Sequence, residues 1–440
     1  MCYYIFNGEE SMQKLKLSFY NIVLEKFDNK YYVWNSKTGA LIRIQQELYE
    51  LMEQNCFDNE RVKRILPKLM KEGIVVEETV DEIKQMLEKY NNDKFNLSEE
   101  VFQLVIAPTL TCNFRCRYCF ENENVRKNTM SEGVVEGLVE FVERRMKQKP
   151  SFSVLQINWF GGEPLLAYDK MLSIYEKLSA VCSKYNVKLE SKMTTNGYFL
   201  TSEKYEDLFE KYNLSSVQVT FDGAEEEYCA RKRTLPDAYN KVKNNIFELS
   251  NYLHKKQFDK KIFIRLNVDK QNYTSVQNFV EEMKNDSRFI DNIVFYLGKL
   301  KDCQKDGCSY CYNSKEFEAL CLNFSNFIGK KVKFPSERSL FCLQCSVNCY
   351  CVGPLGELYK CEHDFGCKEF EVGNIFEGFC SSEYYDKLVG GELDEECKTC
   401  KLFPICKGGC GKERLEEGLP RCEFSIDGLK NTLINIVDKK

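Results

Sequence analysis

A chain of 440 residues with 43% hydrophobic and 13% aromatic residues is long enough for two or three globular domains and too apolar to be disordered. The net charge of −5 gives no basic excess, which argues against a nucleic-acid-binding protein. The first residues lack the pattern of a signal peptide and no long apolar run predicts a membrane span, so we expect a cytoplasmic protein. In that reducing compartment the 23 cysteines, beside only two histidines, predict metal or redox sites rather than disulfides.

Residues 1–98 predict a small N-terminal domain that combines short strands with amphipathic helices. The apolar–polar alternation and the turn residues between the runs predict strands over 17–27, 30–36, 40–45 and 74–78, helices near 46–54 and 60–72, and a charged linking helix over 80–92. Strands, two helices and a final strand in this order are typical of a winged-helix module.

Residues 99–300 predict an α/β domain, because strand-like and helical runs alternate along them. The strands are expected over 103–109, 154–160, 187–193, 216–221, 261–268 and 292–298, and the helices over 131–147, 168–184, 202–212, 236–253 and 273–285. This order favours a parallel sheet or a partial (β/α)6 TIM barrel, in which the chemistry lies at the carboxyl ends of the strands. Residues 301–440, where most of the cysteines fall, lack this pattern and predict a third domain that metal stabilises.

Three cysteines directly follow the first expected strand of the α/β domain. Cys112, Cys116 and Cys119 are separated by three and two residues, a spacing that lets three thiolates converge on one [4Fe–4S] cluster and leaves its fourth iron open. The alternatives are three buried thiols or a zinc site completed by a ligand elsewhere. The strand-to-loop context favours the cluster.

This Cys-x3-Cys-x-aromatic-Cys motif resembles that of the radical S-adenosylmethionine (SAM) superfamily. The resemblance implies that the open iron binds the amino and carboxylate groups of SAM, and that reductive cleavage of SAM gives a 5′-deoxyadenosyl radical that abstracts hydrogen from a substrate. It also implies that Tyr118 lies beside the SAM adenine. An electron donor such as a flavodoxin or ferredoxin is then an expected partner.

Later motifs of the α/β domain match the same family in order. A glycine-rich segment after the second strand resembles the one whose backbone meets the SAM amino group, and polar residues follow the third and fourth strands. The matching residues are Gly161, Gly162, Glu163, Thr195, Asn196 and Asp222. Taken alone, each short motif is more typical of a turn.

Arg231 lies where relatives place an arginine near the SAM carboxylate. Tyr228 and Cys229 replace the His-Asp pair that usually precedes this arginine in the family. A solvated run of charges, which includes Arg233, explains Arg231 equally well.

The cysteines of the third domain resemble those of the SPASM domain, the seven-cysteine extension of radical SAM enzymes that act on peptides and proteins. The resemblance covers about 340–425 and implies two auxiliary [4Fe–4S] clusters, three clusters in all. One cluster is expected on Cys397, Cys400, Cys406 and Cys422, and the other on Cys361 and Cys410 with Cys345 and Cys342. Cys349 and Cys351 crowd the same segment, so the upstream ligands stay open. From spacing alone, a zinc ribbon explains the run that ends at Cys410 equally well.

Glu362 follows Cys361 where sulfatase-maturating relatives carry an aspartate assigned as a base. A carboxylate beside a cluster can accept a substrate proton, which makes Glu362 the candidate catalytic residue, and an exposed acidic loop residue is the alternative. Cys308 and Cys311, near Cys303, are either a further metal or redox pair or partly buried reduced thiols.

The N-terminal region resembles, by pattern alone, the winged-helix peptide-recognition element of peptide-maturating radical SAM enzymes. Such a module binds a leader peptide as an extra strand and raises the local concentration of the core peptide, and the alternative is a domain that only packs on the barrel. The resemblance implies a maturase that joins a cysteine sulfur to a carbon of a ribosomally made precursor peptide, as sactipeptide and ranthipeptide maturases do. Formylglycine formation in a sulfatase and carbon–carbon crosslinking are the competing reactions. A zinc-dependent nucleic-acid-binding module is the non-enzymatic alternative.

Overall fold

The computed structural model describes residues 14–95, 100–119, 128–234, 237–300, 310–331, 345–418 and 424–437, together with residues 334, 335, 337, 342 and 422. Its contacts divide the chain into two compact units. The sheet unit comprises Lys94–Asn313 and Cys342–Gly391, and the terminal unit comprises Met1–Asp93, Ser314–Phe341 and Glu392–Lys440. Both units therefore take residues from the predicted third domain, and the boundaries of the three predicted domains stay predictions.

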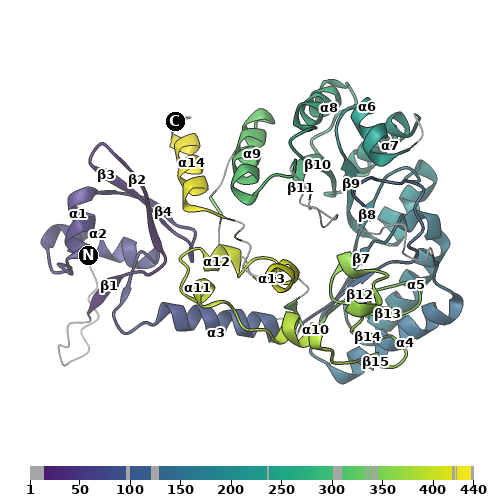
Figure 1. Cartoon of the computed structure of the whole chain (residues 1–440), viewed down its shortest axis with the longest axis horizontal. Helices are drawn as coiled ribbons and strands as arrows, with labels where there is room; N and C mark the ends of the chain where they lie inside the picture. Colours follow the sequence, from purple (N-terminus) through teal and green to yellow (C-terminus); the bar gives the residue numbers. More distant parts are fainter. Residues whose placement is uncertain are drawn as a thin grey trace. The chain divides into compact units, whose positions relative to one another are not determined.

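The sheet unit is built around one ten-stranded sheet (Figure 1). Its strands are β6 (Val101–Ile106), β7 (Val154–Trp159), β8 (Lys188–Thr195), β9 (Leu214–Phe221), β10 (Lys261–Val268), β11 (Ile293–Lys299), β12 (Cys349–Val352), β13 (Glu357–Tyr359), β14 (Gly373–Asn374) and β15 (Gly378–Phe379). The first six lie side by side in chain order and run parallel. β12 adds to β6 in parallel, and β13, β14 and β15 continue from it antiparallel.

Helices connect the parallel strands and supply much of the apolar core. They are α4 (Glu132–Gln148), α5 (Tyr168–Lys184), α6 (Glu225–Lys232), α7 (Asp237–Lys255) and α8 (Tyr273–Asn285), and a short α10 (Glu383–Tyr385) follows the last strand. A parallel strand inside a sheet is covered on both faces, which is why β6 is buried almost throughout. Phe221 of β9 stacks on Phe279 of α8, with 4.3 Å between the ring centroids. The side chain of Ser131 caps the start of α4 by accepting a hydrogen bond from the Val134 N–H.

The predicted strands of the α/β domain are confirmed, and four of its five predicted helices form as expected. The helix predicted over 202–212 is instead a 3₁₀ turn at Ser202–Lys204 and a π-helical turn at Glu206–Lys211. Asn213 ends it with a positive φ of 45°, so the chain enters β9 directly. α6 and β12 were not anticipated from the sequence.

The N-terminal part of the terminal unit contains two small antiparallel sheets and the predicted helices. β2 (Asn21–Phe27), β3 (Lys30–Asn35) and β4 (Leu41–Gln45) form one sheet, and β1 (Leu15–Leu17) pairs with β5 (Val75–Glu77) in the other. Between β4 and β5 lie α1 (Gln46–Glu53) and α2 (Glu60–Lys71), and α3 (Glu82–Phe95) follows. The element order agrees with the sequence pattern, and the winged-helix assignment stays a prediction.

The C-terminal part of the terminal unit packs on these N-terminal strands. It consists of α9 (Ser314–Phe327), α11 (Glu395–Lys398), α12 (Phe403–Cys406), α13 (Gly411–Glu417) and α14 (Ile426–Val437). Trp34 of β3 is fully buried in one apolar cluster with Ile405 and Leu433, and Tyr20 is buried in a second cluster with Phe403. The Lys401 ammonium donates to the Asn21 carbonyl at 2.9 Å. The segment that carries the last cysteines is therefore supported by the N-terminal strands.

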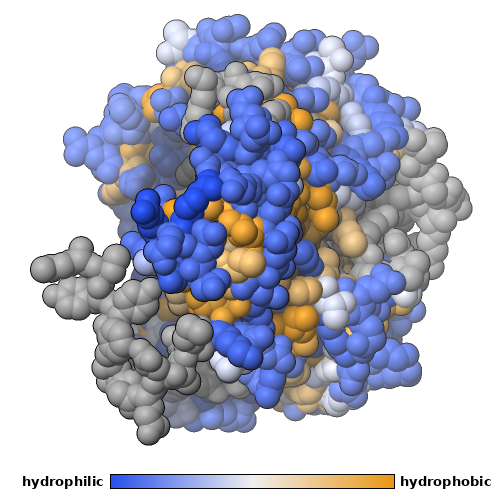
Figure 2. All heavy atoms as spheres, turned by 90° about the vertical axis from the view of Figure 1, so that its left-hand side faces the viewer, coloured by the Kyte–Doolittle hydropathy of each residue, from blue (hydrophilic) through white to orange (hydrophobic). Residues whose placement is uncertain are grey.

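The face shown in Figure 2 is mainly hydrophilic, with hydrophobic side chains in smaller areas between the polar ones. Within the described part of the chain, no helix has the length and apolarity needed to cross a membrane.

Candidate active site and cysteine clusters

The loop that leaves the carboxyl end of β6 carries Cys112, Cys116 and Cys119. The Phe114 N–H lies 3.4 Å from the Cys112 sulfur, and the Cys119 N–H donates to the Cys116 carbonyl at 3.1 Å. Burial raises the pKa of the Cys112 thiol to about 12, and the other two thiols are close enough to contribute to that rise. The structure thus brings the three predicted thiols together. Three convergent thiols at the end of a strand fit a [4Fe–4S] cluster with one open iron.

Gly161 and Gly162, which follow β7, lie against the backbone of this cysteine loop. A Cβ on Gly161 would stand 2.3 Å from the Thr109 carbonyl oxygen, and one on Gly162 would stand 2.4 Å from the Thr111 oxygen. The Gly162 N–H donates to the Thr109 carbonyl at 3.1 Å. Only glycine permits this approach, so the segment has a structural reason for its composition besides any contact with a ligand.

Glu163 is fully buried and connects the loops after β7 and β8. Its carboxylate accepts hydrogen bonds from the Thr195 hydroxyl at 2.7 Å, the Asn196 N–H at 2.8 Å and the Leu165 N–H at 3.1 Å. Burial raises its pKa to about 7. The Asn196 amide in turn lies 3.8 Å from the Cys112 sulfur. Glu163 therefore positions Asn196 beside the cysteine loop.

Tyr118 and Asp222 interact directly, although they are far apart in sequence. The Tyr118 hydroxyl lies 2.6 and 2.8 Å from the two Asp222 carboxylate oxygens, and the Asn267 amide donates to the same hydroxyl at 3.1 Å. Burial and the Asp222 charge raise the pKa of Tyr118 well above its usual range. The buried ammonium of Lys232 lies 3.6 Å from Asp222 and 5.6 Å from the centre of the Tyr118 ring. The ends of β9 and β10 thus fix the aromatic residue of the cysteine motif.

Arg231 and Lys232 are buried on α6, which excludes the solvated charge run for these two residues. The Arg231 guanidinium binds both Asp269 oxygens at 2.7 Å and also Glu227. The cation whose charge reaches the Cys116 thiol is Lys232. Backbone N–H groups of the cysteine loop donate to the carbonyls of both residues, at 3.0 and 3.1 Å. Sequence reasoning did not single out Lys232, because its burial depends on α6. The contact of Arg231 with SAM stays a prediction.

A second group of thiols surrounds β12 in the sheet unit. Cys345, Cys349, Cys351 and Cys361 are all buried, and burial raises the pKa of Cys349 to about 11. The Cys351 thiol is close enough to Cys349 and Cys361 for their charges to raise its own pKa further. Cys342 is exposed. The structure therefore keeps Cys349 and Cys351 among the candidate ligands of the first auxiliary cluster.

Glu362 begins a 3₁₀ turn at Glu362–Asp364, directly after Cys361. It is half-buried, and its charge reaches the Cys349 and Cys351 thiols. The exposed-loop alternative therefore does not describe it. Its role as a base stays a prediction.

A third group of thiols lies in the terminal unit. The charges of Cys400, Cys406 and Cys422 all reach the Cys397 thiol, whose pKa burial raises to about 11. These are the four cysteines expected to hold one auxiliary cluster. Cys410, at the start of α13, also belongs to the terminal unit, so its predicted pairing with Cys361 of the sheet unit stays a prediction.

The other thiols include some outside the described residues and some that are structural. Cys303 and Cys308 lie outside the described residues, so the suggested pair with Cys311 is not tested. Burial raises the pKa of Cys182 and of Cys321 to about 12, as expected for structural thiols. Among the side chains that the structure describes, no three His, Cys, Asp or Glu residues are close enough to hold a single metal ion.

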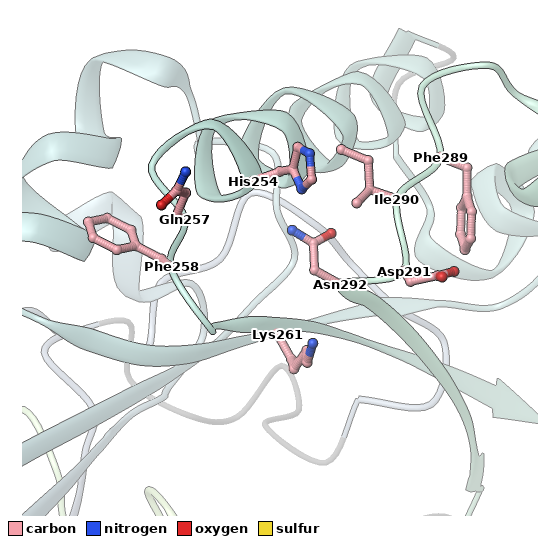
Figure 3. A pocket seen from close by; sticks show the side chains of 8 residues that line it. All are labelled: His254, Gln257, Phe258, Lys261, Phe289, Ile290, Asp291 and Asn292. Atoms are coloured by element: carbon pink, nitrogen blue, oxygen red, sulfur yellow. The ribbon is translucent and has the colours of Figure 1, made fainter.

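A hollow of the sheet unit lies at the opposite end of the strands (Figure 3). It is lined by His254, Gln257, Phe258, Lys261, Phe289, Ile290, Asp291 and Asn292. Lys261 begins β10 and Asn292 precedes β11, so the hollow opens at the amino ends of these strands. The cysteine loop follows the carboxyl end of a parallel strand, so this hollow is not part of the candidate active site.

Comparison with known proteins identifies the family of the central segment. Residues 106–283 match the model of the radical SAM superfamily. The chain is 22% identical over 444 residues to the radical SAM cyclopropyl synthase TigE of Paramaledivibacter caminithermalis, which covers 90% of both chains. It is 26% identical over 348 residues to a cysteine-type anaerobic sulfatase-maturating enzyme of Clostridium perfringens, which covers 71% of this chain and 89% of that enzyme.

Solved structures share the fold. The enzyme anSMEcpe with bound AdoMet aligns with a TM-score of 0.56 at 20% identity, over 77% of this chain and 97% of that one. The same enzyme has been solved with AdoMet and a peptide, Kp18Cys. Streptococcus suis SuiB bound to S-adenosylmethionine aligns with a TM-score of 0.52 at 16% identity, over 93% of this chain and 99% of that one. The predicted α/β fold of a radical SAM core with terminal extensions is therefore confirmed.

Proposed function

We propose that the chain is a radical SAM enzyme that modifies a ribosomally made precursor peptide, and the match of residues 106–283 to the radical SAM model supports this. The observation that carries this proposal is the convergence of Cys112, Cys116 and Cys119 at the carboxyl end of β6. The proposal that the substrate is a peptide rests on relatives of this chain. TigE matches nearly the whole chain, and anSMEcpe binds a peptide.

In this proposal the three thiolates hold a [4Fe–4S] cluster, and Gly161, Gly162 and Asn196 line the neighbouring site for SAM. When bound, these groups supply a radical that removes a hydrogen atom from the substrate. The protein's own residues orient them. Glu163 fixes Asn196 at the cysteine loop, and Asp222 fixes Tyr118.

Two auxiliary clusters complete the proposal and bring the number of clusters to three. Cys397, Cys400, Cys406 and Cys422 hold one of them. Cys361 and Cys410 contribute to the other, together with ligands drawn from Cys342, Cys345, Cys349 and Cys351. Glu362, half-buried beside these thiols, is the proposed acceptor of a substrate proton.

We assign thioether formation as the reaction, in which a substrate cysteine loses its S–H proton and a second residue loses a hydrogen atom from carbon. The hydrogen atom would pass to the SAM-derived radical and the proton to Glu362, and the remaining electron would be taken up by a cluster. A cluster site rich in thiols beside a half-buried carboxylate supports this assignment. The nearly full-length match to a cyclopropyl synthase favours a second candidate, the formation of a carbon–carbon bond. The match to a sulfatase-maturating enzyme omits more of the chain and gives formylglycine formation less support. The N-terminal sheets are the proposed binding site of the leader peptide, and a flavodoxin or ferredoxin is the proposed electron donor.

The first test measures iron, sulfide and SAM cleavage after anaerobic reconstitution. We expect about twelve irons per chain, a loss of about four in the Cys112/Cys116/Cys119→Ala variant, and no 5′-deoxyadenosine from that variant. A matched control replaces the same number of cysteines outside the clusters, as Cys56/Cys182/Cys321→Ala, and should keep the iron and the cleavage. Zinc in place of iron, or cleavage that survives the first triple change, would contradict the proposal.

The second test identifies the bond that the enzyme forms in a candidate precursor peptide that contains cysteine. A thioether removes two hydrogens and protects one substrate cysteine from alkylation. A cyclopropane removes two hydrogens and leaves every cysteine open to alkylation. An aldehyde that a hydrazide traps would indicate formylglycine instead.

A further inference from the structure

Lys360, directly before Cys361, is a buried cation without a carboxylate partner. Its side chain is 1% exposed, and it forms no ion pair with any described carboxylate. Its ammonium donates to the carbonyls of Ser346 and Cys349, both at 2.5 Å. An ammonium has three N–H donors, and no described protein group accepts the third.

Burial lowers the pKa of Lys360, whereas the groups around its nitrogen favour the charged ammonium. The rings of Tyr350 and Tyr385 have their centres 4.8 and 5.7 Å from its nitrogen, within the range of a cation–π contact. Burying an unpaired charge is costly, so a nearby anion is needed to stabilise it. The thiols of Cys345, Cys349 and Cys351 are within electrostatic reach of the nitrogen. These are the thiols of the proposed first auxiliary cluster.

A second buried lysine provides a contrast within the same chain. Lys407 directly follows Cys406, and it is 2% exposed. Its ammonium lies 3.1 Å from the Glu337 carboxylate, which also binds Lys89 at 2.7 Å. The charge of Lys407 is therefore offset by a carboxylate, whereas that of Lys360 is not.

We propose that Lys360 is a positioning residue whose ammonium donates its third N–H to a sulfur of the first auxiliary cluster and raises the reduction potential of that cluster. A thiolate-ligated cluster carries net negative charge, and reduction by one electron adds to it. Hydrogen bonds to the sulfurs and nearby positive charge therefore favour the reduced form. This inference rests on the proposed function, because it requires the cluster to be present.

The test is a redox titration of the reconstituted full chain, followed by the electron paramagnetic resonance of the reduced clusters. The Cys112/Cys116/Cys119→Ala background leaves only the auxiliary clusters to contribute. Lys360→Met should make the reduction of one auxiliary cluster at least tenfold less favourable. For a one-electron reduction, this change lowers the midpoint reduction potential by about 59 mV. Lys360→Arg should keep the midpoint near its original value, and the control Lys407→Met should shift neither midpoint tenfold.

Unchanged midpoints in Lys360→Met, or an equal shift in Lys360→Arg, would refute the role of the charge. Iron content separates the remaining outcomes. Loss of a cluster from Lys360→Met but not from Lys360→Arg supports the role of the charge, because arginine keeps the positive charge and methionine removes it. Loss from both variants shows that the exact side chain is needed and overturns it. A background protein with no auxiliary iron at all would instead overturn the cluster assignment of the proposed function, and with it this inference.

Discussion

Replacing Gly162 with alanine should disable the candidate site without unfolding the sheet. The new Cβ would lie 2.4 Å from the Thr111 carbonyl oxygen and 2.6 Å from that of Leu110. Both are backbone atoms, so no side-chain rotation relieves the clash, and the cysteine loop must retreat by about 1 Å to regain an ordinary contact. A displacement of that size at a catalytic site costs about 100-fold in rate, beside about 1–3 kcal/mol of stability from overpacking.

The assay compares the rate of 5′-deoxyadenosine formation and the iron content of Gly162→Ala with those of the unmodified protein. Gly133→Ala is the matched control, because the nearest atom to its Cβ is the Ser131 hydroxyl at 3.9 Å. That change lies in α4 and should stabilise the helix by about 0.5–1 kcal/mol with no effect on the rate. A Gly162→Ala protein that cleaves SAM at the unmodified rate would refute the close approach of the two loops as a requirement for activity.

Further predictions concern stability. Asp269→Asn breaks the buried pair with Arg231 and should lower the unfolding free energy by about 3 kcal/mol in denaturant titrations, whereas Lys63→Met in an exposed pair should change it little. Folding raises the pKa of Glu163 from 4.5 to about 7, so its contribution to the free energy of unfolding is full below pH 4.5 and is lost as the pH rises toward 7. This loss amounts to about 3 kcal/mol, and Glu163→Gln should remove it from the pH dependence of stability. A pH profile that is the same in Glu163→Gln would contradict the burial argument. Removing iron with a chelator should expose the cysteine-rich segment of the terminal unit to protease before the parallel sheet, and equal cleavage of both would show that metal does not stabilise it.

The parallel sheet was predictable because each strand is a short apolar run followed by a helical stretch. β9 and β10 illustrate this, since alternate residues are buried along β9 and along the first part of β10, and Asp222 and Asp269 directly follow the two strands. The apolar pattern of the sequence did not predict the secondary structure where tertiary contacts decide the conformation. The connection before β9 closes as a π-helical turn, and β12 is a strand that pairs with both β6 and β13.

Spacing predicted the first group of cysteines, whereas the two auxiliary groups were expected from the resemblance to the SPASM domain and stay predictions. Cys112, Cys116 and Cys119 fall within one loop, whereas Cys397 lies in α11, Cys406 in α12 and Cys400 between these two helices. Tyr118 was recognised as part of the motif, but its bond to Asp222 spans 104 residues and depends on how the strands are ordered. No local pattern carries that information.

The buried lysines mark the boundary between what sequence and structure reveal. Lys232, Lys360 and Lys407 are indistinguishable by sequence from the exposed majority of the 62 lysines and arginines. In the structure each is buried beside a cysteine of a different group: Lys232 by Cys116, Lys360 by the thiols around β12, and Lys407 directly after Cys406. Burying a lysine is costly unless it meets an anion, and two of these lysines have a carboxylate partner, since Lys232 pairs with Asp222 and Lys407 with Glu337. Lys360 has no described carboxylate partner, so its burial is the one of the three that favours an anionic group at the neighbouring thiols, and the proposed first auxiliary cluster would supply that group.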